Sequence, residues 1–413
     1  MIPIELGLVE PLGRLIARPW ASEVTGMQID SRRIEEGDLF VAVGGGSDFV
    51  AHALARGAAA ALVPEEAHRA LALIAGAVRD RSIARVVGIT GATGKTTTKD
   101  ILAALCIPGL RTVASEGNYN NELGVPLTLC RIEPDTELCI VEMGMRGLGQ
   151  IAWLASFVRP DVGLITNIAP VHLELVGTIE NVARAKAELI EALPSGGTAV
   201  VPEDPLLEPY LTRTDIEIRR FGRVQASGRF EVGGRLVALE TGYSAPHQLQ
   251  NTLAALTVCD VLGVEIPEGR LEVEFSPLRE EVVELADGVT LINDCYNANP
   301  VSMLAALAHL SELARDRRRV AVLGEMAELG DAAPSYHREV GEEVARSGVA
   351  ALVAVGPLAE GYAAAAGGVE SRLVGSADEA GEALLELIRP GDVVLVKGSR
   401  AVGLESVAAK LNR

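Results

Sequence analysis

Fully apolar runs alternate with helical segments in two long stretches of this sequence, and this pattern constrains the fold more than any other feature. The first stretch extends from Arg85 to Leu193 and holds the runs RVVGIT, TELCIVEMG and DVGLITNI. The second begins near residue 288 and holds GVTLIND, RRVAVLGEM, GVAALVAVG, SRLVG and DVVLVKGS. Strands that are apolar on both faces and separated by helices are typical of βαβ units in a parallel sheet. We therefore predict two parallel α/β units in one chain.

The length and the remaining segments divide the chain further. At about 150 residues per domain, 413 residues are enough for two or three domains. Residues 1 to about 80 combine a strand-like DLFVAV with helical segments and predict a small α/β domain. Between Thr198 and Thr241, short runs separated by glycine turns predict an antiparallel extension, which a helix from about Gln248 to Leu262 closes. We expect three domains, at residues 1–82, 83–277 and 278–413.

Charge and cysteine content exclude several classes of protein. The chain has 37 Lys and Arg against 56 Asp and Glu, a formal charge of −19, so it is poorly suited to neutralising a nucleic-acid backbone. We expect no nucleic-acid partner. The first residues do not resemble a secretion signal, and no run of about 18 apolar residues would insert in a membrane. The five cysteines are widely spaced and form no CxxC pair, which is typical of reduced thiols in a cytoplasmic protein.

A glycine-rich segment, GITGATGKTTT from Gly88 to Thr98, follows one of the apolar runs and precedes a helical segment. In this setting successive backbone N–H groups and a helix N-terminus can surround phosphate groups. Lys95 would reach the outer phosphates of a nucleotide, and the Thr96 hydroxyl would bind Mg²⁺. A glycine turn without function is the alternative, but a strand, the sequence GKT and a helix in succession favour phosphate binding.

Two candidate metal ligands follow later strands of the same stretch. Glu142 ends the run LCIVE, and His172 follows LITNIAPV. Because ligands of open α/β sheets bind at the carboxyl edge of the strands, both side chains are expected beside the glycine-rich loop. A single Glu is usually solvated and a single His usually structural, but the shared edge favours a nucleotide-bound metal ion here.

Lysine is scarce in this chain. The 37 basic residues include only five lysines, at positions 95, 99, 186, 397 and 410. A lysine retained where arginine is the common basic residue is a candidate for chemistry that needs a primary amine. Lys186 lies between small residues in a predicted helix from Ile179 to Leu193. Its amine could react with CO₂ to give a metal-binding carbamate, whereas the alternative is an ordinary surface lysine paired with Glu188.

The segment from Gly88 to Thr98 resembles the ATP-binding signature of the Mur ligase family. Members of this family use ATP to form the amide bonds of the peptidoglycan precursor peptide. Further motifs extend the resemblance over almost the whole chain, from Asp30-Ser-Arg32 to Lys397-Gly-Ser-Arg400. They are GNYNNELGVPLT at 117–128, EMG at 142–144, HLE at 172–174, DCYNANP at 294–300 and GEMAELG at 324–330. Together they are most similar to the branch of the family that adds D-alanyl-D-alanine to UDP-N-acetylmuramoyl-tripeptide.

The resemblance implies an α/β fold with three domains. These are a small α/β N-terminal domain that holds the uridine end of the substrate, a central P-loop parallel-sheet ATPase domain with the antiparallel extension, and a C-terminal Rossmann-like domain that binds the amine substrate. The implied cofactors are ATP and Mg²⁺, with N-carboxylysine at position 186. The implied metal ligands are Thr96, Glu142, His172 and the Lys186 carbamate.

The resemblance also assigns residues to each ligand. Contacts with ATP are expected from Gly91, Thr93, Gly94, Lys95, Thr96, Thr97, Asn251, Arg279 and Asp294. Contacts with the other substrates are expected from Ser31, Arg32, Asn118, Asn121, Asn299, Ser399 and Arg400. Roles in catalysis are expected for Lys95, Lys186, His172 and Asn297. A helix-capping role for Ser31, and plain exposed charges around Lys397 to Arg400, are the alternatives.

The expected reaction is amide formation between the tripeptide carboxylate and D-alanyl-D-alanine through an acyl phosphate, giving the UDP-linked pentapeptide, ADP and phosphate. We expect a cytoplasmic monomer whose third domain closes onto the central one around Arg279 and Asp294. One alternative is the sister ligase that adds the diamino acid at the third position, although its Asp-Asn-Pro-Arg run is absent here. Another is a P-loop switch ATPase, which would hydrolyse ATP without either substrate.

Overall fold

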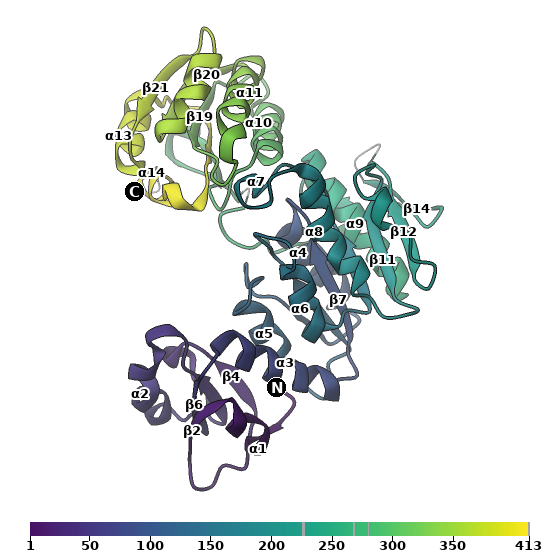
Figure 1. The fold of residues 1–413 in the computed structure, drawn as a ribbon. Coiled ribbons are helices and arrows are strands. Elements are labelled where there is room, and N and C mark those ends of the chain that lie inside the picture. Colours follow the sequence, from purple (N-terminus) through teal and green to yellow (C-terminus); the bar gives the residue numbers. More distant parts are fainter. Residues whose placement is uncertain (225–227, 267–268, 280, 412–413) are drawn as a thin grey trace.

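The computed structural model describes residues 1–224, 228–266, 269–279 and 281–411. Three bodies follow one another along the chain, and Figure 1 shows them as an open arc with the N-terminal body at one end and the C-terminal body at the other. Each main sheet lies inside one of the three predicted residue ranges, while the boundaries themselves stay predictions. In the described ranges, no helix is both long and apolar enough to cross a bilayer.

The N-terminal body contains a four-stranded sheet in the order β2-β6-β5-β4. The strands are β2 (Gly13–Ala17), β4 (Gly26–Gln28), β5 (Asp38–Val41) and β6 (Ala60–Pro64), and a separate pair joins β1 (Ile4–Glu5) to β3 (Glu23–Val24). Its helices are α1 (Leu6–Val9), α2 (Val50–Ala55) and α3 (Ala67–Arg81). Helix α3 packs against helices α5 and α6 of the central body, so the two bodies share one apolar core.

The central body is built on a six-stranded parallel sheet in the order β12-β11-β10-β7-β9-β8. The strands are β7 (Arg85–Thr90), β8 (Thr112–Ala114), β9 (Leu138–Glu142), β10 (Val162–Ile165), β11 (Thr198–Pro202) and β12 (Glu217–Phe221). Alternate residues of β7 face opposite cores: Val86 belongs to one, whereas Val87 and Ile89 belong to the other. This two-sided burial explains why the strands read as continuous apolar runs.

The helices of the central body cover both faces of the sheet. They are α4 (Lys95–Cys106), α5 (Gly124–Leu129), α6 (Gln150–Val158), α7 (Leu173–Val176), α8 (Ile179–Glu191) and α9 (Pro246–Leu262). Helices α4 and α9 pack together on one side of the sheet, and α6 and α8 pack together on the other. The glycine-rich loop joins the end of the central strand β7 to the start of helix α4, as the sequence predicts.

The antiparallel extension is smaller than predicted. The run IEIRRFG forms β12, which pairs with β11 in parallel, because residues 203–216 between them carry the chain back before it runs forward again. Among the described residues of this region, only β13 (Arg229–Val232) and β14 (Arg235–Ala238) form an antiparallel hairpin, closed by Gly233 and Gly234. A short parallel pair, β15 (Glu240–Thr241) and β16 (Arg270–Leu271), completes this region.

The C-terminal body has a six-stranded sheet in the order β17-β18-β22-β19-β20-β21. Within the part of this body that the structure describes, only the edge strand β17 runs antiparallel to its neighbour. The strands are β17 (Glu281–Glu284), β18 (Thr290–Asp294), β19 (Arg319–Gly324), β20 (Val349–Val355), β21 (Glu370–Val374) and β22 (Val393–Lys397). The helices are α10 (Pro300–Ala314), α11 (Ala333–Arg346), α12 (Glu360–Ala365), α13 (Ala377–Leu387) and α14 (Glu405–Leu411).

Candidate active site

The glycine-rich loop connects β7 to α4 and depends on two glycines with positive φ. Gly91 has φ +150° and Gly94 has φ +76°. A Cβ atom at Gly91 would overlap the Thr166 hydroxyl, and one at Gly94 would overlap the side-chain amide of Asn251. The loop is thus held closely against the ends of β10 and α9. Lys95 opens α4, and its Nζ donates to the Gly91 carbonyl oxygen at 2.9 Å.

Asn167 holds the centre of this loop. Its side-chain oxygen accepts from the Thr93 backbone N–H at 2.9 Å, and its amide nitrogen donates to the Thr93 hydroxyl at 2.6 Å. The Thr166 hydroxyl donates to the Thr93 carbonyl oxygen at 2.6 Å. Both residues directly follow strand β10, so the loop conformation is fixed from the same sheet edge that was predicted to bind ligands.

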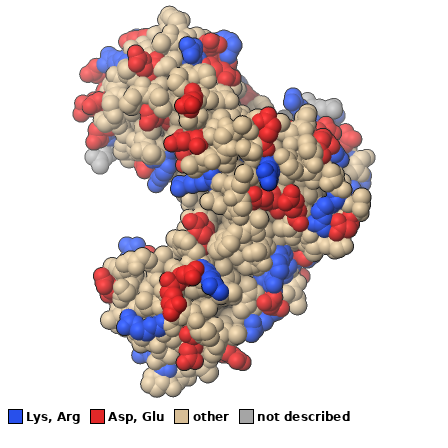
Figure 2. Space-filling model, in the orientation of Figure 1, with Lys and Arg blue, Asp and Glu red and all other residues tan. Residues whose placement is uncertain are grey.

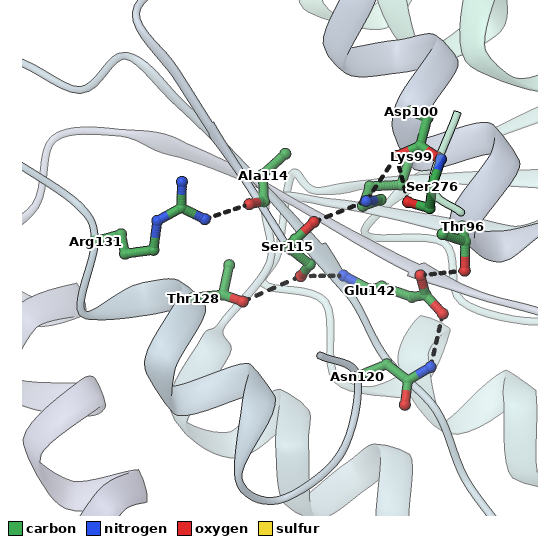
Figure 3. Close-up of polar contacts among 10 residues, drawn as sticks. All are labelled: Thr96, Lys99, Asp100, Ala114, Ser115, Asn120, Thr128, Arg131, Glu142 and Ser276. Atoms are coloured by element: carbon green, nitrogen blue, oxygen red, sulfur yellow. Dashed lines mark hydrogen bonds and ion pairs between the residues drawn. The ribbon is translucent and has the colours of Figure 1, made fainter. Parts of the chain in front are cut away.

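Glu142 lies at the end of β9 and is fully buried. Figure 3 shows its two carboxylate oxygens held from opposite sides: Thr96 donates to Oε2 at 2.8 Å and Asn120 donates to Oε1 at 2.7 Å. The Ser115 hydroxyl accepts from the Glu142 backbone N–H at 3.0 Å. Both side-chain partners are neutral, so they orient the carboxylate without cancelling its charge. A buried, oriented carboxylate beside a phosphate loop fits a divalent cation.

Lys95 lies within electrostatic reach of this carboxylate, and Lys186 and His172 lie within electrostatic reach of Lys95. Lys186, on α8, is 2% exposed, and burial lowers the pKa of its amine well below the usual value, with the charge on Lys95 lowering it further. Burial also lowers the pKa of Lys95, which Glu142 opposes and Arg279 reinforces. The structure thus places Lys186 in the interior and not on the surface, against the alternative of a surface pair with Glu188. The Glu188 carboxylate instead accepts from the backbone N–H groups of Gly149 and Ala152.

His172 sits at the N-terminus of the short helix α7, in a left-handed conformation with φ 56°. Its Nδ1 contacts the Oε2 atom of Glu328, a residue of the C-terminal body. Burial lowers the pKa of His172, while the hydrogen bond and charge of Glu328 raise it and the charges of Lys186 and Lys95 lower it. The imidazole therefore contacts the third domain and is within reach of the charges of both lysines.

The C-terminal body brings a second group of polar residues toward the loop. The Arg279 guanidinium lies over the Tyr296 ring, 4.0 Å from its centroid. Asp294 ends β18, and its carboxylate pairs with the buried Lys397 ammonium at 2.5 Å. Lys397 also donates to the Asn297 carbonyl oxygen at 3.0 Å. Lys397 thus holds the Asp294 carboxylate and the Asn297 backbone together. Its amine is occupied by these contacts inside the third domain.

A cavity of about 1340 Å³ collects these groups between the central and C-terminal bodies. Of the residues predicted from the sequence, it is lined by Thr93, Gly94, Lys95, Thr96, Thr97, Asn118, Asn121, Glu142, His172, Asn251, Arg279, Asp294, Asn297 and Asn299. Gly91 and Lys186 are not among the residues that line it. Two of the asparagines also have structural tasks: Asn121 accepts from the Leu123 and Gly124 N–H groups, and Asn299 caps α10 with Ser302.

Four predicted substrate residues lie away from this cavity. In the N-terminal body, Ser31 is buried against His52, with 2.9 Å between Oγ and Nδ1, and Arg32 is an exposed residue paired with Asp30. The cap of this helical turn is Asp30, which accepts from the Arg32 N–H, so Ser31 is not the capping residue. In the C-terminal body, Ser399 accepts from the Ala327 N–H, and Arg400 faces Glu405 at 3.5 Å. Their roles in substrate binding stay predictions.

Sequence reasoning missed three residues that the structure brings to the site: Asn120, Asn167 and Glu328. Asn120 lies between two asparagines that the sequence did single out, and Glu328 lies in the GEMAELG motif. Asn167 lies two residues after the end of β10, within the apolar run DVGLITNI. Their positions in motifs or at strand ends were visible in the sequence, but their partners Glu142, His172 and Thr93 are distant along the chain and could not be deduced.

A strand, a phosphate-binding loop, a buried carboxylate and a facing third domain define a class of ATP-using ligases. Family models agree: the Mur ligase middle domain matches residues 89–259, and the Mur ligase, glutamate ligase domain matches residues 278–400. The chain belongs to the Mur ligase family.

Individual relatives place it more closely within that family. A protein of Synechocystis named UDP-N-acetylmuramoyl-tripeptide--D-alanyl-D-alanine ligase is 35% identical over 92% of this chain and 90% of its own length. The structure of MurF from Acinetobacter baumannii superposes with a TM-score of 0.83 at 27% identity and covers 99% of this chain and 98% of that one. MurF ligase from Thermotoga maritima, solved in complex with ADP, gives 0.79 at 28% identity, covering 94% of this chain and 97% of that one.

Proposed function

We propose that this chain is the ATP-dependent ligase that joins D-alanyl-D-alanine to UDP-N-acetylmuramoyl-tripeptide. The observation that carries the proposal is the cavity between the central and C-terminal bodies. A phosphate-binding loop with Lys95 and Thr96 lines one side, and the Asn297 and Asn299 segment of the third domain lines the other. ATP and an amine substrate can therefore meet in one space, as ligation requires and simple ATP hydrolysis does not. The names of the relatives above support the choice of substrates.

The chemistry follows from the charges in the cavity. A tripeptide carboxylate oxygen attacks the γ-phosphorus of ATP, the bond to the ADP oxygen breaks, and an acyl phosphate and ADP result. The D-alanyl-D-alanine amine then attacks the acyl carbon, loses a proton, and phosphate leaves as the C–O bond breaks. Lys95 stabilises the charge on the phosphoryl oxygens, and the loop N–H groups orient the phosphates. Closure of the third domain would keep water from the acyl phosphate.

Magnesium fits the residues of this site. When bound, Mg²⁺ would supply neutralisation of phosphate charge, and Thr96, Glu142 and His172 would hold it. In the described ranges, no three His, Cys, Asp or Glu side chains come together around a common point. Oxygen ligands from phosphate, from water and from a modified Lys186 would therefore complete the coordination.

Carbamylation of Lys186 fits its surroundings. The neutral amine attacks the carbon of CO₂, forming an N–C bond and releasing one proton, so the product is an anion. Burial and Lys95 lower the pKa of the Lys186 amine, which increases the neutral fraction that can react. The anion would then interact favourably with the cationic Lys95, whose charge disfavours the protonated amine.

The experiment that tests the function measures phosphate release from ATP and Mg²⁺. Parallel reactions contain UDP-N-acetylmuramoyl-tripeptide, D-alanyl-D-alanine, both or neither, and a further reaction contains the dipeptide precursor with a diamino acid. The proposal expects release only when both are present, together with a pentapeptide product detected by mass spectrometry. Release without either substrate would identify a switch ATPase. Release that requires a diamino acid and the dipeptide precursor would identify the sister ligase.

The remaining expectations concern where and in what form the protein works. The polar precursor substrates and the five buried, unbridged cysteines support a cytoplasmic enzyme. We expect a monomer without a nucleic-acid partner, because the net charge of −19 disfavours phosphate backbones. Figure 2 shows acidic and basic side chains mixed over the visible face, without a large basic area. Light scattering of the purified protein would test the monomer directly.

A further inference from the structure

The contact between His172 and Glu328 joins two domains at the candidate metal site. We infer that Glu328, from the C-terminal body, is a positioning residue for His172. Its carboxylate accepts the Nδ1 proton and leaves Nε2 as the ring nitrogen that can bind a cation. The part of the inference that concerns a cation rests on the proposed function, whereas the part that concerns the ring proton does not.

The geometry of the pair fixes the direction of the hydrogen bond. Glu328 Oε2 contacts His172 Nδ1, and Glu328 Oε1 lies 3.7 Å from the Arg146 Nε atom. A carboxylate can only accept, so the ring proton must reside on Nδ1. The neutral ring then keeps its free electron pair on Nε2. Carboxylate groups that hold one nitrogen of an imidazole in this way orient metal-binding histidines.

The backbone around His172 and the backbone around Glu328 are both held in place for this contact. His172 has φ 56° and Glu328 has φ 62°, and both are residues with a side chain in the left-handed region. Such conformations persist where surrounding contacts hold them. Here the Glu174 N–H donates to the Glu328 carbonyl oxygen at 3.2 Å, and α7 packs against the turn Gly330–Ala332. Figure 1 shows α7 lying against the C-terminal body.

A simpler reading makes Glu328 a docking contact that only holds the two bodies together. In that case the loss of Glu328 would weaken docking of the two bodies but would not change the tautomer of His172 systematically. Water or another acceptor could take the place of the Glu328 carboxylate. Arg146 offers a matched control. It contacts the other oxygen of the same carboxylate from the central body, so Arg146→Ala removes part of the docking contact without touching His172.

The first measurement follows the ring proton in the complete protein without metal or nucleotide. The chain has six histidines, so selective ¹⁵N labelling and a two-bond ¹H–¹⁵N spectrum resolve them, and His172→Asn assigns the relevant signal. We expect the Nδ1–H tautomer in the wild type and in Arg146→Ala, and a shift toward Nε2–H in Glu328→Ala. Glu328→Gln retains an acceptor and should restore much of the Nδ1–H signal. An unchanged tautomer in a folded Glu328→Ala variant would overturn the inference.

The second measurement is Mn²⁺ binding in the presence of ADP, followed by electron paramagnetic resonance. We expect Glu328→Ala to weaken Mn²⁺ binding about 10- to 100-fold, Glu328→Gln to weaken it less, and Arg146→Ala to change it by less than about 3-fold. A shifted tautomer with unchanged Mn²⁺ affinity would overturn the role of His172 Nε2 in cation binding. Neither measurement uses the peptide substrates, so failure of the proposed ligase reaction would leave both results interpretable. If Glu328→Ala does not fold, Glu328→Leu, which also lacks a hydrogen-bond acceptor, carries both tests.

Discussion

Thr96 and Glu142 are joined by a hydrogen bond of 2.8 Å that connects the first turn of α4 to the end of β9. These residues are 46 positions apart, and the bond brings a hydroxyl and a buried carboxylate to one point beside the phosphate loop. Both groups are oxygen ligands of the kind that Mg²⁺ prefers.

The Glu142→Gln variant keeps the shape of the side chain but removes its charge. We expect ligase activity to fall by about 100-fold or more, because loss of a ligand should cost at least as much as loss of an outer partner. Folding should be almost unaffected, since the amide can still accept from Thr96 or Asn120. Kinetics as a function of Mg²⁺ concentration and a thermal unfolding curve would check both statements. Asn120→Ala is the intermediate case, with an expected loss of about 10-fold. Activity unchanged in the Gln variant would remove Glu142 from the metal site.

The Gly94→Ala variant tests the fit of the loop against α9. The methyl group would enter the space of the Asn251 amide, and φ +76° disfavours any side chain. We expect the KM for ATP to rise at least about 10-fold and the free energy of unfolding to fall by about 1–3 kcal/mol. Gly109→Ala is the matched control, because a Cβ there meets nothing within 4 Å. Equal effects of the two substitutions would show that the Asn251 contact is unimportant.

The Lys397→Met variant tests the buried ion pair of the third domain. Removing the ammonium leaves the Asp294 charge in a buried position, and we expect a loss of about 3–5 kcal/mol of stability. The double variant Lys397→Met with Asp294→Asn should recover part of that loss. Chemical denaturation of the three proteins would measure the coupling. Additive effects of the two substitutions would contradict the pairing.

His337 makes the folding stability of the third domain depend on pH. Its Nε2 accepts from the Met326 N–H at 3.0 Å and its Nδ1 donates to the Ala333 carbonyl oxygen at 2.7 Å, so only the neutral ring fits. Burial lowers the pKa of His337 below 6.5 in the folded state. The unfolded chain therefore binds the proton first, and stability is retained above pH 6.5 and falls as the pH drops below it.

Calorimetry of the wild type and of His337→Gln between pH 5 and pH 8 would measure this effect. The wild type should lose more stability than the variant on acidification, so that the difference between them narrows toward pH 5. Parallel curves would show that another group controls the acid sensitivity. The control His68→Gln lies on an exposed part of α3 and should leave the wild-type slope unchanged.

Much of the site could be predicted from the sequence because parallel strands share an edge. Lys95, Glu142 and His172 each lie at or after the carboxyl end of a predicted strand, so their location at one sheet edge could be predicted. The direction of β12 could not be predicted, because strand pairing depends on how the intervening fourteen or so residues fold back and not on the apolar pattern alone. The same holds for the partners of Asn120 and Glu328, since hydrogen bonds between distant segments leave no periodic signal.

The His172–Glu328 contact also connects two events that a ligase must coordinate. If a cation binds better when Glu328 holds the imidazole, then by reciprocity a bound cation strengthens the contact between the central and C-terminal bodies. Small-angle scattering with and without Mg²⁺ and ADP would detect a more compact average shape in the wild type. Glu328→Ala should lose that response while Arg146→Ala keeps most of it.

A second network shows where the third domain is attached. Asp100, one position after the buried Lys99 on α4, accepts from the Ser276 backbone N–H at 2.9 Å, and Lys99 donates to the Ser115 carbonyl oxygen at 2.7 Å (Figure 3). Ser276 directly precedes the segment that carries Arg279. The connection to the third domain is thus held by the same helix that begins with Lys95. This helix therefore links movement of the third domain to the phosphate loop.

The scarcity of lysine has a practical consequence for handling the protein. Lys99, Lys186 and Lys397 are each no more than 3% exposed, and Lys95 faces the cavity. Lys410, near the C-terminal end, has a side chain that is one-third exposed. Among the lysine side chains, we expect Lys410 to react most readily with reagents that couple to primary amines. A dye or a sensor surface joined at Lys410 attaches to α14 of the C-terminal body, and Lys410 does not line the cavity.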